Sequence, residues 1–268
     1  MDFIKDVWEG HGYIPRVWDD WLKDRKSKML VVLADGKQVG MNRVRFLADG
    51  SAWFEGARVH PDYRGKGLAT ALGERSMELA ADKGVRVFRL TSGTWNKQAH
   101  RQIARMAFRE ASRVSVYAPP EGAKMFPQKG VRKAKYADLP DVVRAIRTSR
   151  EFRISSGVMW DTFAAMALTR QMIARAVGKG EVFLTDGALA IVVEGAEGPG
   201  SWRQVGFLTG EGKAAVRLVR HFFGMKGRKA DRRFVYAPQG STVIGALRRA
   251  GLKRDFSLIL FERRAAKG

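Results

Sequence analysis

The stretch Val59-His60-Pro61-Asp62-Tyr63-Arg64-Gly65-Lys66-Gly67-Leu68-Ala69 decides how the first part of this 268-residue chain is interpreted. It follows a β-like run and leads into a segment with leucines at helical spacing, which predicts a strand, a turn and a helix. The first amides of a helix lack partners within it and carry the positive end of its dipole. Gly65 and Gly67 have no Cβ that would keep an anion from these amides. Arg64 and Lys66 add formal charge, so the turn predicts a backbone site for a phosphate group.

Two other phosphate-binding patterns fit the chain less well. The nearest approach to a P-loop, Gly206 followed by Gly212-Lys213, has one residue too many and ends in Ala214 where Ser or Thr is required. The dinucleotide fingerprint, with its later acidic residue, is missing.

With its preceding strand and following helix, the motif Arg64-x-x-Gly67-x-Ala69 after Val59-x-Pro61 resembles the pyrophosphate loop of the GNAT N-acetyltransferase superfamily. The resemblance covers residues 10–118 and implies acetyl-CoA as cosubstrate, with no metal. It also implies that the strand before the loop splays from its neighbour and pairs with the pantetheine arm, the Val59 amide facing the acetyl oxygen. The coenzyme-binding residues that it implies are Ala57, Arg58, Val59, Arg64, Gly65, Lys66, Gly67, Leu68, Ala69 and Thr70.

Glu55 stands four residues before Val59, where many GNAT proteins keep a carboxylate that removes the amine proton directly or through water. An alkylamine with a pKa of about 10 is only about one part in a thousand neutral at pH 7, a handicap near 4 kcal/mol. The resemblance therefore implies that Glu55 is the general base. The alternative is that Glu55 is an ion-pair partner of an arginine such as Arg58.

Asn96 opens the next predicted helix, where GNAT proteins place an Asn that hydrogen-bonds the pantetheine arm. It would serve equally as a plain N-cap. The Tyr that these enzymes use to protonate the departing thiolate, seven residues further on, is Ile103 here. Either the thiolate leaves unaided or another group serves as the acid, with Tyr117 and His100 as candidates.

The chain reads as a tandem repeat of one α/β (α+β) fold, a mixed, mostly antiparallel sheet flanked by helices. The predicted GNAT-like domains are residues 1–120 and 121–268, joined by a linker at Ala118–Gly122. The second half includes a predicted long helix from about Met159 to Val177. Its segment Leu208-Thr209-Gly210-Glu211-Gly212-Lys213 lacks the loop motif, and Glu211 would repel phosphates. We therefore expect a degenerate second copy that completes the substrate site, supports a homodimer or holds a polyanion.

Cysteine is absent, which excludes disulfides, thiolate zinc sites and a cysteine nucleophile and favours a reducing compartment. The longest apolar run, Leu189–Val193, is far too short to cross a bilayer. The N-terminus has no signal-peptide pattern. We expect a soluble, cytoplasmic protein.

The net charge of +22 is concentrated in the second half of the chain. Residues 1–120 carry 21 lysines and arginines against 14 acidic residues, whereas residues 121–268 carry 28 against 13. Such a balance attracts polyanions such as RNA, or it describes a solvated basic surface. The tract Met225–Arg233 is the best local candidate for a polyanion site.

The acceptor amine is the least determined part of the prediction. Gly12-Tyr13-Ile14-Pro15, Trp21-Leu22 and Glu55-Gly56 are similar to the vertebrate histidine N-acetyltransferase group, which implies direct acetyl transfer to a small amino-acid-like amine. A lysine of a basic protein would be repelled by the enzyme's own charge. Two alternatives remain open: an acetyltransferase that acts on RNA or a ribonucleoprotein, and a non-catalytic, acetyl-CoA-sensing module that binds nucleic acid.

Overall fold

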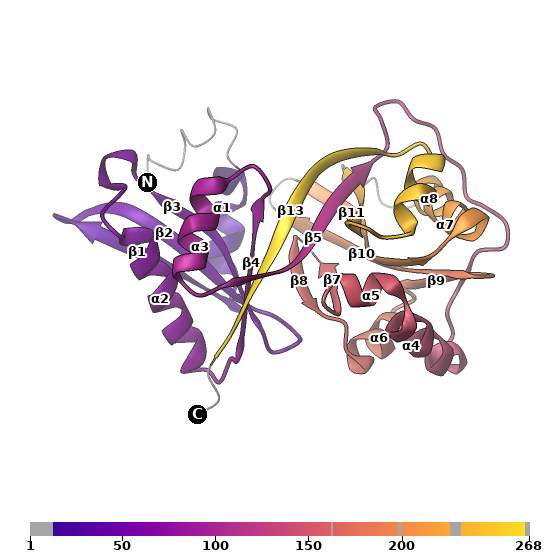
Figure 1. Cartoon of the computed structure of the whole chain (residues 1–268), viewed down its shortest axis with the longest axis horizontal. Helices are drawn as coiled ribbons and strands as arrows, with labels where there is room; N and C mark the ends of the chain where they lie inside the picture. Colours follow the sequence, from indigo (N-terminus) through magenta and orange to yellow (C-terminus); the bar gives the residue numbers. More distant parts are fainter. Residues whose placement is uncertain (1–12, 162, 198–199, 226–231, 266–268) are drawn as a thin grey trace. The chain divides into compact units, whose positions relative to one another are not determined.

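A computed structural model of the chain describes residues 13–161, 163–197, 200–225 and 232–265, which divide into two compact units (Figure 1). The first unit consists chiefly of the described residues up to Glu110 and those from Leu260 onward. The second consists of Ala111–Ala196 and Gly200–Ile259. The sequence predicted a domain boundary at residue 120. In the structure, residues 111–120 belong to the second unit, and the last strand from Leu260 onward belongs to the first.

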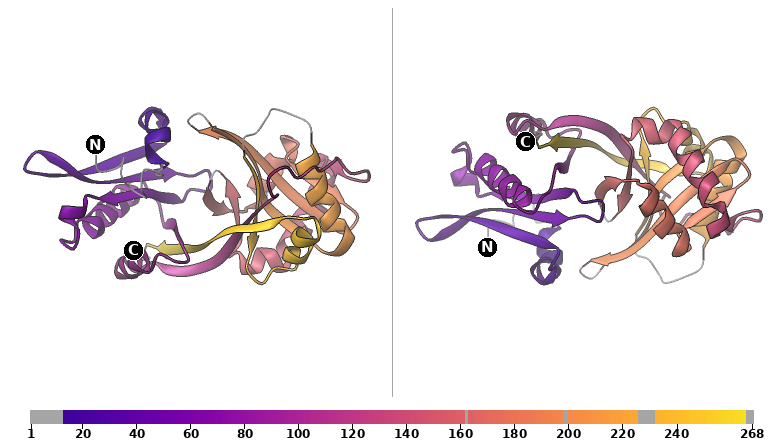
Figure 2. Two further views of the ribbon diagram at one scale, coloured as in Figure 1. Left: turned by 90° about the horizontal axis from the view of Figure 1, so that it is seen from above. Right: turned by 90° about the horizontal axis from the view of Figure 1, so that it is seen from below.

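The first unit is a sheet in the order β1-β2-β3-β4-β13, flanked by helices. α1 begins with Pro15 in its first turn and buries Ile14, Val17 and Trp21, three positions on one helical face, against Met41 of the sheet. α2 packs across β1, β2 and β3 (Figure 2). The elements are α1 (Ile14–Lys23), β1 (Ser27–Ala34), β2 (Lys37–Phe46), β3 (Ala52–Val59), the 3₁₀ turn η2 (Pro61–Tyr63), α2 (Leu68–Ala81), β4 (Val87–Gly93) and α3 (Lys97–Arg105).

The second unit is a sheet in the order β13-β5-β12-β11-β10-β9-β6, with α7 and α8 packed on its main apolar core. A separate hairpin, β7-β8, contacts β11. The elements are β5 (Arg109–Ala118), β6 (Arg132–Lys133), η3 (Tyr136–Asp138), α4 (Leu139–Thr148), α5 (Arg150–Ile154), β7 (Val158–Asp161), β8 (Ala164–Ala167), α6 (Arg170–Gly178), β9 (Val182–Thr185), β10 (Ala188–Glu197), β11 (Gly200–Gly210), α7 (Gly212–Gly224), β12 (Arg232–Pro238), α8 (Val243–Arg249) and β13 (Lys253–Arg264).

Each unit contains the same strand–helix–parallel strand crossover. β3 and β4 are parallel and joined by α2, and β11 and β12 are parallel and joined by α7. The remaining strand pairs with a defined register are antiparallel. The predicted fold class, two halves with mixed, mostly antiparallel sheets flanked by helices, is confirmed.

The predicted helix from Met159 to Val177 is wrong. The segment forms the β7-β8 hairpin, turns at Phe163 with φ +61°, and becomes helical only at Arg170. Thr169 caps that helix, because its hydroxyl accepts the Met172 amide at 3.2 Å. Short apolar runs such as Val158–Trp160 do not distinguish a buried strand from a helix by periodicity alone.

Two sequence predictions concern segments that the structure covers only in part or not at all. Of the basic tract Met225–Arg233, residues 226–231 lie outside the described residues, and so does the N-terminus up to residue 12. None of the helices in the described residues combines the length and the apolar character that a membrane span requires.

Candidate active site

β3 and β4 separate before β3 ends. Their parallel pairing runs from Ala52 opposite Phe88 to Phe54 opposite Leu90, whereas β3 continues to Val59. On its other side β3 stays paired with β2 up to its last residue. In the described part of the chain, the end of β3 therefore has no strand partner on the side of β4, which leaves its peptide groups available to an extended ligand. This is the splay that the family resemblance implies.

The loop after β3 is held open by two glycines with left-handed backbone. His60 accepts the Asp62 amide at 3.3 Å and so starts the 3₁₀ turn η2. Gly65 has φ +80° and Gly67 has φ +78°, a conformation that costs an L-residue about 1–2 kcal/mol. A Cβ at either glycine would meet no atom within 4 Å. The space beside both glycines is therefore open, and a side chain at either position would enter it.

Five consecutive amides of this loop have no acceptor among the described residues. The Thr70 and Ala71 amides both donate to the Gly67 carbonyl at 3.0 Å, which closes the first turn of α2. Within the described residues no acceptor is bound by the amides of Gly65, Lys66, Gly67, Leu68 and Ala69. The loop therefore presents a row of N–H donors at a helix N-terminus, as a diphosphate site requires. Thr70 could contribute only its hydroxyl, because its amide belongs to the helix.

Both cations of the loop are exposed. Arg64 folds back so that its Nε donates to the Val59 carbonyl at 3.2 Å. The Lys66 Nζ lies 4.9 Å from the centre of the Tyr63 ring. Neither cation has a carboxylate partner among the described residues, so both charges are available to an anion.

A β-bulge in β3 shapes the opposite side of the site. Pairing with β2 shifts by one residue around Gly56, which has φ +69°. A Cβ on Gly56 would come within 2.7 Å of the Trp21 indole. The absence of a side chain at Gly56 therefore leaves room for the indole to pack against the strand. Trp21 is 2% exposed and packs in the core of the first unit.

The bulge brings Glu55 and Arg58 to one face of the sheet. Glu55 pairs with Arg43, and Arg58 pairs with Met41. Arg43 and Met41 are two residues apart on β2 and so share a face, which places both partners on that face as well. It is the face that α1 covers, because Met41 packs with the buried side chains of that helix.

Glu55 is bound by two arginines, neither of which is Arg58. Its carboxylate receives Arg43 Nη1 at 2.7 Å and lies 3.7 Å from Arg45 Nη1. Arg43 is 3% exposed, also binds Asp24 at 2.6 Å, and lies 4.6 Å from the centre of the Trp21 ring. This network fixes the carboxylate in place. Sequence reasoning missed it, although Arg43 and Arg45 alternate on one strand face opposite Glu55, and that spacing was the available signal.

Arg58 is half-buried with part of its guanidinium unused. Its Nη1 donates to the Ala57 carbonyl at 2.8 Å, while its buried Nε has no partner among the described residues. Burial lowers the pKa of Arg58, and the nearby Tyr13 acts in the opposite direction. A partly desolvated cation with an unused donor is suited to bind an anionic group of a ligand.

The start of α3 has fewer groups to offer. Asn96 is the N-cap, with its side-chain oxygen accepting the Ala99 amide at 3.1 Å, so this capping role is confirmed. His100 Nε2 is 2.9 Å from the Gly93 carbonyl, which makes this nitrogen the donor. Ile103, at the position of the usual Tyr, is 6% exposed and belongs to the core.

Tyr117 lies in the second unit. It is 2% exposed, pairs with Val235 of β12 and belongs to the apolar cluster around α7 and α8. A phenol packed in this core is not offered to a thioester, so we assign Tyr117 no role as the acid.

Comparison with known protein families agrees with this geometry. Residues 2–108 match the family model described as the acetyltransferase (GNAT) family. The first unit is a GNAT acetyltransferase domain. The family that the loop motif predicted is thereby confirmed.

A second comparison links the GNAT domain to named enzymes. A stretch of 94 residues, 34% of the chain, is 33% identical to histidine N-acetyltransferase of Oreochromis niloticus. The same enzyme of Scomber australasicus is 32% identical over a stretch of equal length. In each case the chain spans only 28% of the relative's length.

Solved structures extend the likeness through both halves of the chain. A GCN5-related N-acetyltransferase from Sphaerobacter thermophilus matches 98% of this chain and 89% of its own, with a TM-score of 0.62 and 18% identity. A protein from Thermoplasma acidophilum classed as an acetyltransferase matches 94% and 84%, with a TM-score of 0.60 and 19% identity. At these identities the likeness concerns the fold.

The second unit has no equivalent of the GNAT loop. Between β3 and α2 lie residues 60–67, whereas between β11 and α7 lies only Glu211. β11 and β12 also stop pairing early, at Val205 opposite Val235. A protein side chain, Glu151 of α5, bridges the ends of this second splay.

Glu151 is 2% exposed and accepts four hydrogen bonds. Thr209 at the end of β11 donates at 2.7 Å, Ser241 donates at 3.0 Å, and Thr242 donates through its hydroxyl at 2.9 Å and its amide at 3.2 Å. Burial raises the pKa of Glu151, but the hydrogen bonds from Thr209, Thr242 and Ser241 outweigh it, so the net pKa is lowered. The carboxylate occupies the place that corresponds to the opening in the GNAT domain, which agrees with a degenerate second copy.

Among the described residues there is no group of three or more histidines and acidic residues that could hold a metal ion. The GNAT loop itself consists of backbone donors and cations, which suit a diphosphate.

Proposed function

We propose that this protein transfers the acetyl group of acetyl-CoA to the amine of a small amino-acid-like acceptor. The observation that carries the proposal is the splay of β3 from β4, with the row of free amides from Gly65 to Ala69 at its end. A strand edge without a partner suits the pantetheine arm, and free amides at a helix N-terminus suit the diphosphate. Asn96 would contribute its remaining amide donor to the pantetheine arm.

In the proposed reaction the acceptor nitrogen attacks the thioester carbonyl carbon, and the C–S bond breaks as coenzyme A leaves. Glu55 takes the proton from the amine, and the Val59 amide faces the developing oxyanion. The two arginines at Glu55 hold its position. Deprotonation through a water molecule is compatible with this arrangement.

The thiolate of coenzyme A is the proposed leaving group without a dedicated acid. A thiol has an ordinary pKa of about 8.5, so its anion is a stable product near neutral pH. Ile103 supplies no proton, and the His100 Nε2 proton is engaged by the Gly93 carbonyl.

The pair Glu55 and Arg58 supports an acceptor with both an amine and a carboxylate. Their strand partners are two residues apart, which corresponds to about 7 Å along the sheet. A carboxylate and a guanidinium at this separation suit the two charged groups of an α-amino acid, the amine at Glu55 and the carboxylate at Arg58. The relatives named histidine N-acetyltransferase point to the same class of acceptor.

A thiol-release assay tests this proposal. The protein would be supplied with acetyl-CoA and, in turn, with L-histidine, other amino acids, and histamine, which is histidine without its carboxylate. We expect thiol release with at least one amino acid and a much lower rate with the matching decarboxylated amine. If no amino acid supports release above the rate of acetyl-CoA hydrolysis, the acceptor class is wrong.

The basic second half favours two other candidates. The first is an acetyltransferase whose acceptor is an amine of a nucleic acid or ribonucleoprotein, and the second is a coenzyme-sensing module without turnover. Adding tRNA to the same assay separates these functions. Thiol release that depends on tRNA supports the first, and tRNA binding without release supports the second.

A further inference from the structure

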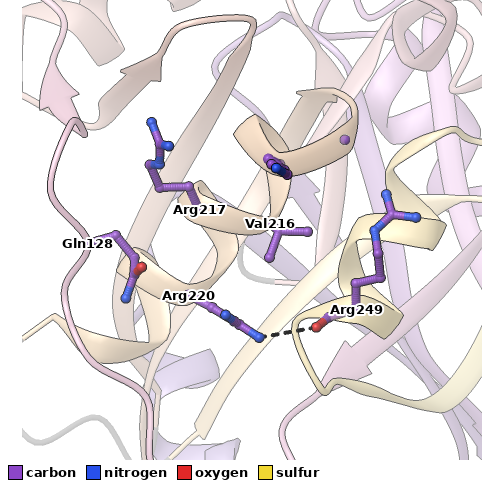
Figure 3. Close-up of a pocket in the computed structure, with 7 residues that line it drawn as sticks. Gln128, Val216, Arg217, Arg220 and Arg249 are labelled. Carbon is purple, nitrogen blue, oxygen red and sulfur yellow. Dashed lines mark hydrogen bonds between the residues drawn. The ribbon is translucent and has the colours of Figure 1, made fainter.

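The strongest unassigned feature is a basic cavity in the second unit, formed between α7, α8 and the segment before β6. It has a volume of about 690 Å³ and is lined by Gln128, Lys213, Val216, Arg217, Arg220 and Arg249, together with the first residue of α7. Figure 3 shows Arg217 and Arg220 projecting from α7 and Arg249 from α8. We propose that this cavity, named the basic groove here, binds a ligand that carries two or more phosphate groups.

The charges of the basic groove are not neutralised by the protein. No acidic side chain is among the described residues that line it. None of its four cations forms an ion pair within the described residues, whereas other arginines of the second unit do, such as Arg132 with Asp138 at 2.7 Å. Glu211, the acidic residue nearest in sequence, does not line the cavity. Four like charges around one cavity repel one another, and an anion relieves this repulsion.

The cations lie at regular positions on rigid elements. Lys213, Arg217 and Arg220 are four and three residues apart, so they share one face of α7. The segment opposite is tied to the same helix, because the Gln128 amide donates to His221 Nδ1 at 3.1 Å. Arg220 Nη2 lies 3.4 Å from the Arg249 carbonyl, which links α7 to α8 at the edge of the groove. Hydrogen bonds therefore link the three segments that form the groove to one another.

The size and the charge of the groove indicate its ligand. Small-molecule sites commonly have volumes of roughly 300–1,000 Å³, and a single phosphate would fill only a small part of such a space. One phosphate carries at most about two negative charges, fewer than the four cations offer. Arginine binds phosphate in a bidentate manner, and three arginines line this cavity. A nucleoside polyphosphate or successive phosphates of a nucleic-acid strand satisfy these requirements.

Binding of two probes tests the proposal and distinguishes the two sources. ATP represents a free polyphosphate, and a single-stranded RNA of about 12 nucleotides represents a strand. Affinities would be measured by fluorescence anisotropy or calorimetry with the full chain, at about 50 and 200 mM salt. The measurements would use a Gly67→Ala background, which is expected to weaken binding of ATP to the acetyl-CoA loop.

The decisive variant is Arg217→Gln with Arg220→Gln. We expect it to weaken the tighter probe about 10-fold or more. For RNA, log K falls with log salt, and loss of two phosphate contacts should make this negative slope shallower by about 1.4. The matched control is Arg147→Gln with Arg170→Gln, which removes the same charge from exposed positions on α4 and α6 and should leave the affinity unchanged.

Each outcome decides the proposal. Selective weakening with ATP bound at least as tightly as RNA assigns a free polyphosphate ligand, and selective weakening with RNA bound more tightly assigns a nucleic-acid strand. If neither probe binds at about 50 mM salt, or if both double variants weaken binding equally, the groove is only part of a generally basic surface and the proposal is overturned.

Discussion

Replacing Gly67 by alanine tests the proposed coenzyme site directly. The added Cβ meets no protein atom within 4 Å, so the substitution causes no clash in the free protein. Its cost to folding arises from the left-handed φ of +78° alone and should be about 1–2 kcal/mol. In the complex, however, the same methyl group enters the space in which a diphosphate would contact the amides of Gly65 to Ala69.

The effect on binding should exceed the effect on folding. A hydrogen bond to a charged group contributes about 1.5–3 kcal/mol, so loss of one amide–phosphate contact weakens acetyl-CoA binding about 10- to 150-fold. Gly50→Ala is the matched control, because Gly50 has φ +79° and equally open surroundings but lies in the turn between β2 and β3. Both variants should lose similar stability in chemical denaturation, and only Gly67→Ala should lose acetyl-CoA affinity in calorimetry.

The reasoning would be refuted if both variants bind acetyl-CoA as tightly as the wild type does. Such a result would mean that the loop amides do not contact the diphosphate. Equal losses of affinity would point to backbone strain in general. Only a selective loss in Gly67→Ala supports the assigned site.

Three further changes test other parts of the site. Glu55→Gln should lower the acetylation rate about 10²-fold while acetyl-CoA still binds, whereas the exposed Glu78→Gln should have no effect; an unchanged rate would remove Glu55 as the base. Arg58→Gln should raise KM for an amino-acid acceptor but leave KM for its decarboxylated amine and the acetyl-CoA affinity unaltered, and equal changes for both acceptors would contradict a carboxylate contact. Glu151→Ala should destabilise the chain by about 2–4 kcal/mol, because it leaves buried donors such as Thr209 without an acceptor. Since the pKa of Glu151 is lowered on folding, the stability that it contributes is present above its unfolded pKa of about 4.3 and is lost as the pH falls through the folded value. At pH values below about 4, the denaturation midpoint of the wild type should therefore decrease more steeply with falling pH than that of Glu151→Ala. Parallel profiles of the two proteins would contradict the assignment.

Most local elements could be predicted from the sequence because their signals are local. Asp35-Gly36 and Asp49-Gly50 mark the hairpin turns on either side of β2, and Gly36 and Gly50 do adopt positive φ. Leu139, Val142 and Ile146 recur at helical spacing, and they form the buried face of α4. The β7-β8 hairpin was missed because a strand buried on both sides carries no alternation of apolar and polar residues that would separate it from a helix.

In the candidate site, too, the features with a local sequence signal could be predicted and the others could not. The anion loop could be predicted because its amides, glycines and cations are neighbours in sequence. The setting of Glu55 could not, because its partner Arg43 comes from another strand and is itself bound by Asp24 at the end of α1. A one-residue bulge in β3 also decides that Glu55 and Arg58 share a face. Tyr117 looked available for catalysis until the fold placed it in the core of the second unit.

By itself, the sequence determined a glycine-rich anion loop at a helix N-terminus, the GNAT fold that surrounds it, and a strongly basic second half. Only the tertiary structure decided that Glu55 shares a face with Arg58, that Glu151 closes the second splay, and that four cations of α7 and α8 line one cavity. The physical reason is range. Turns and helix ends follow from interactions between adjacent residues, whereas strand register, burial and the meeting of distant charges depend on contacts that exist only once the chain has folded.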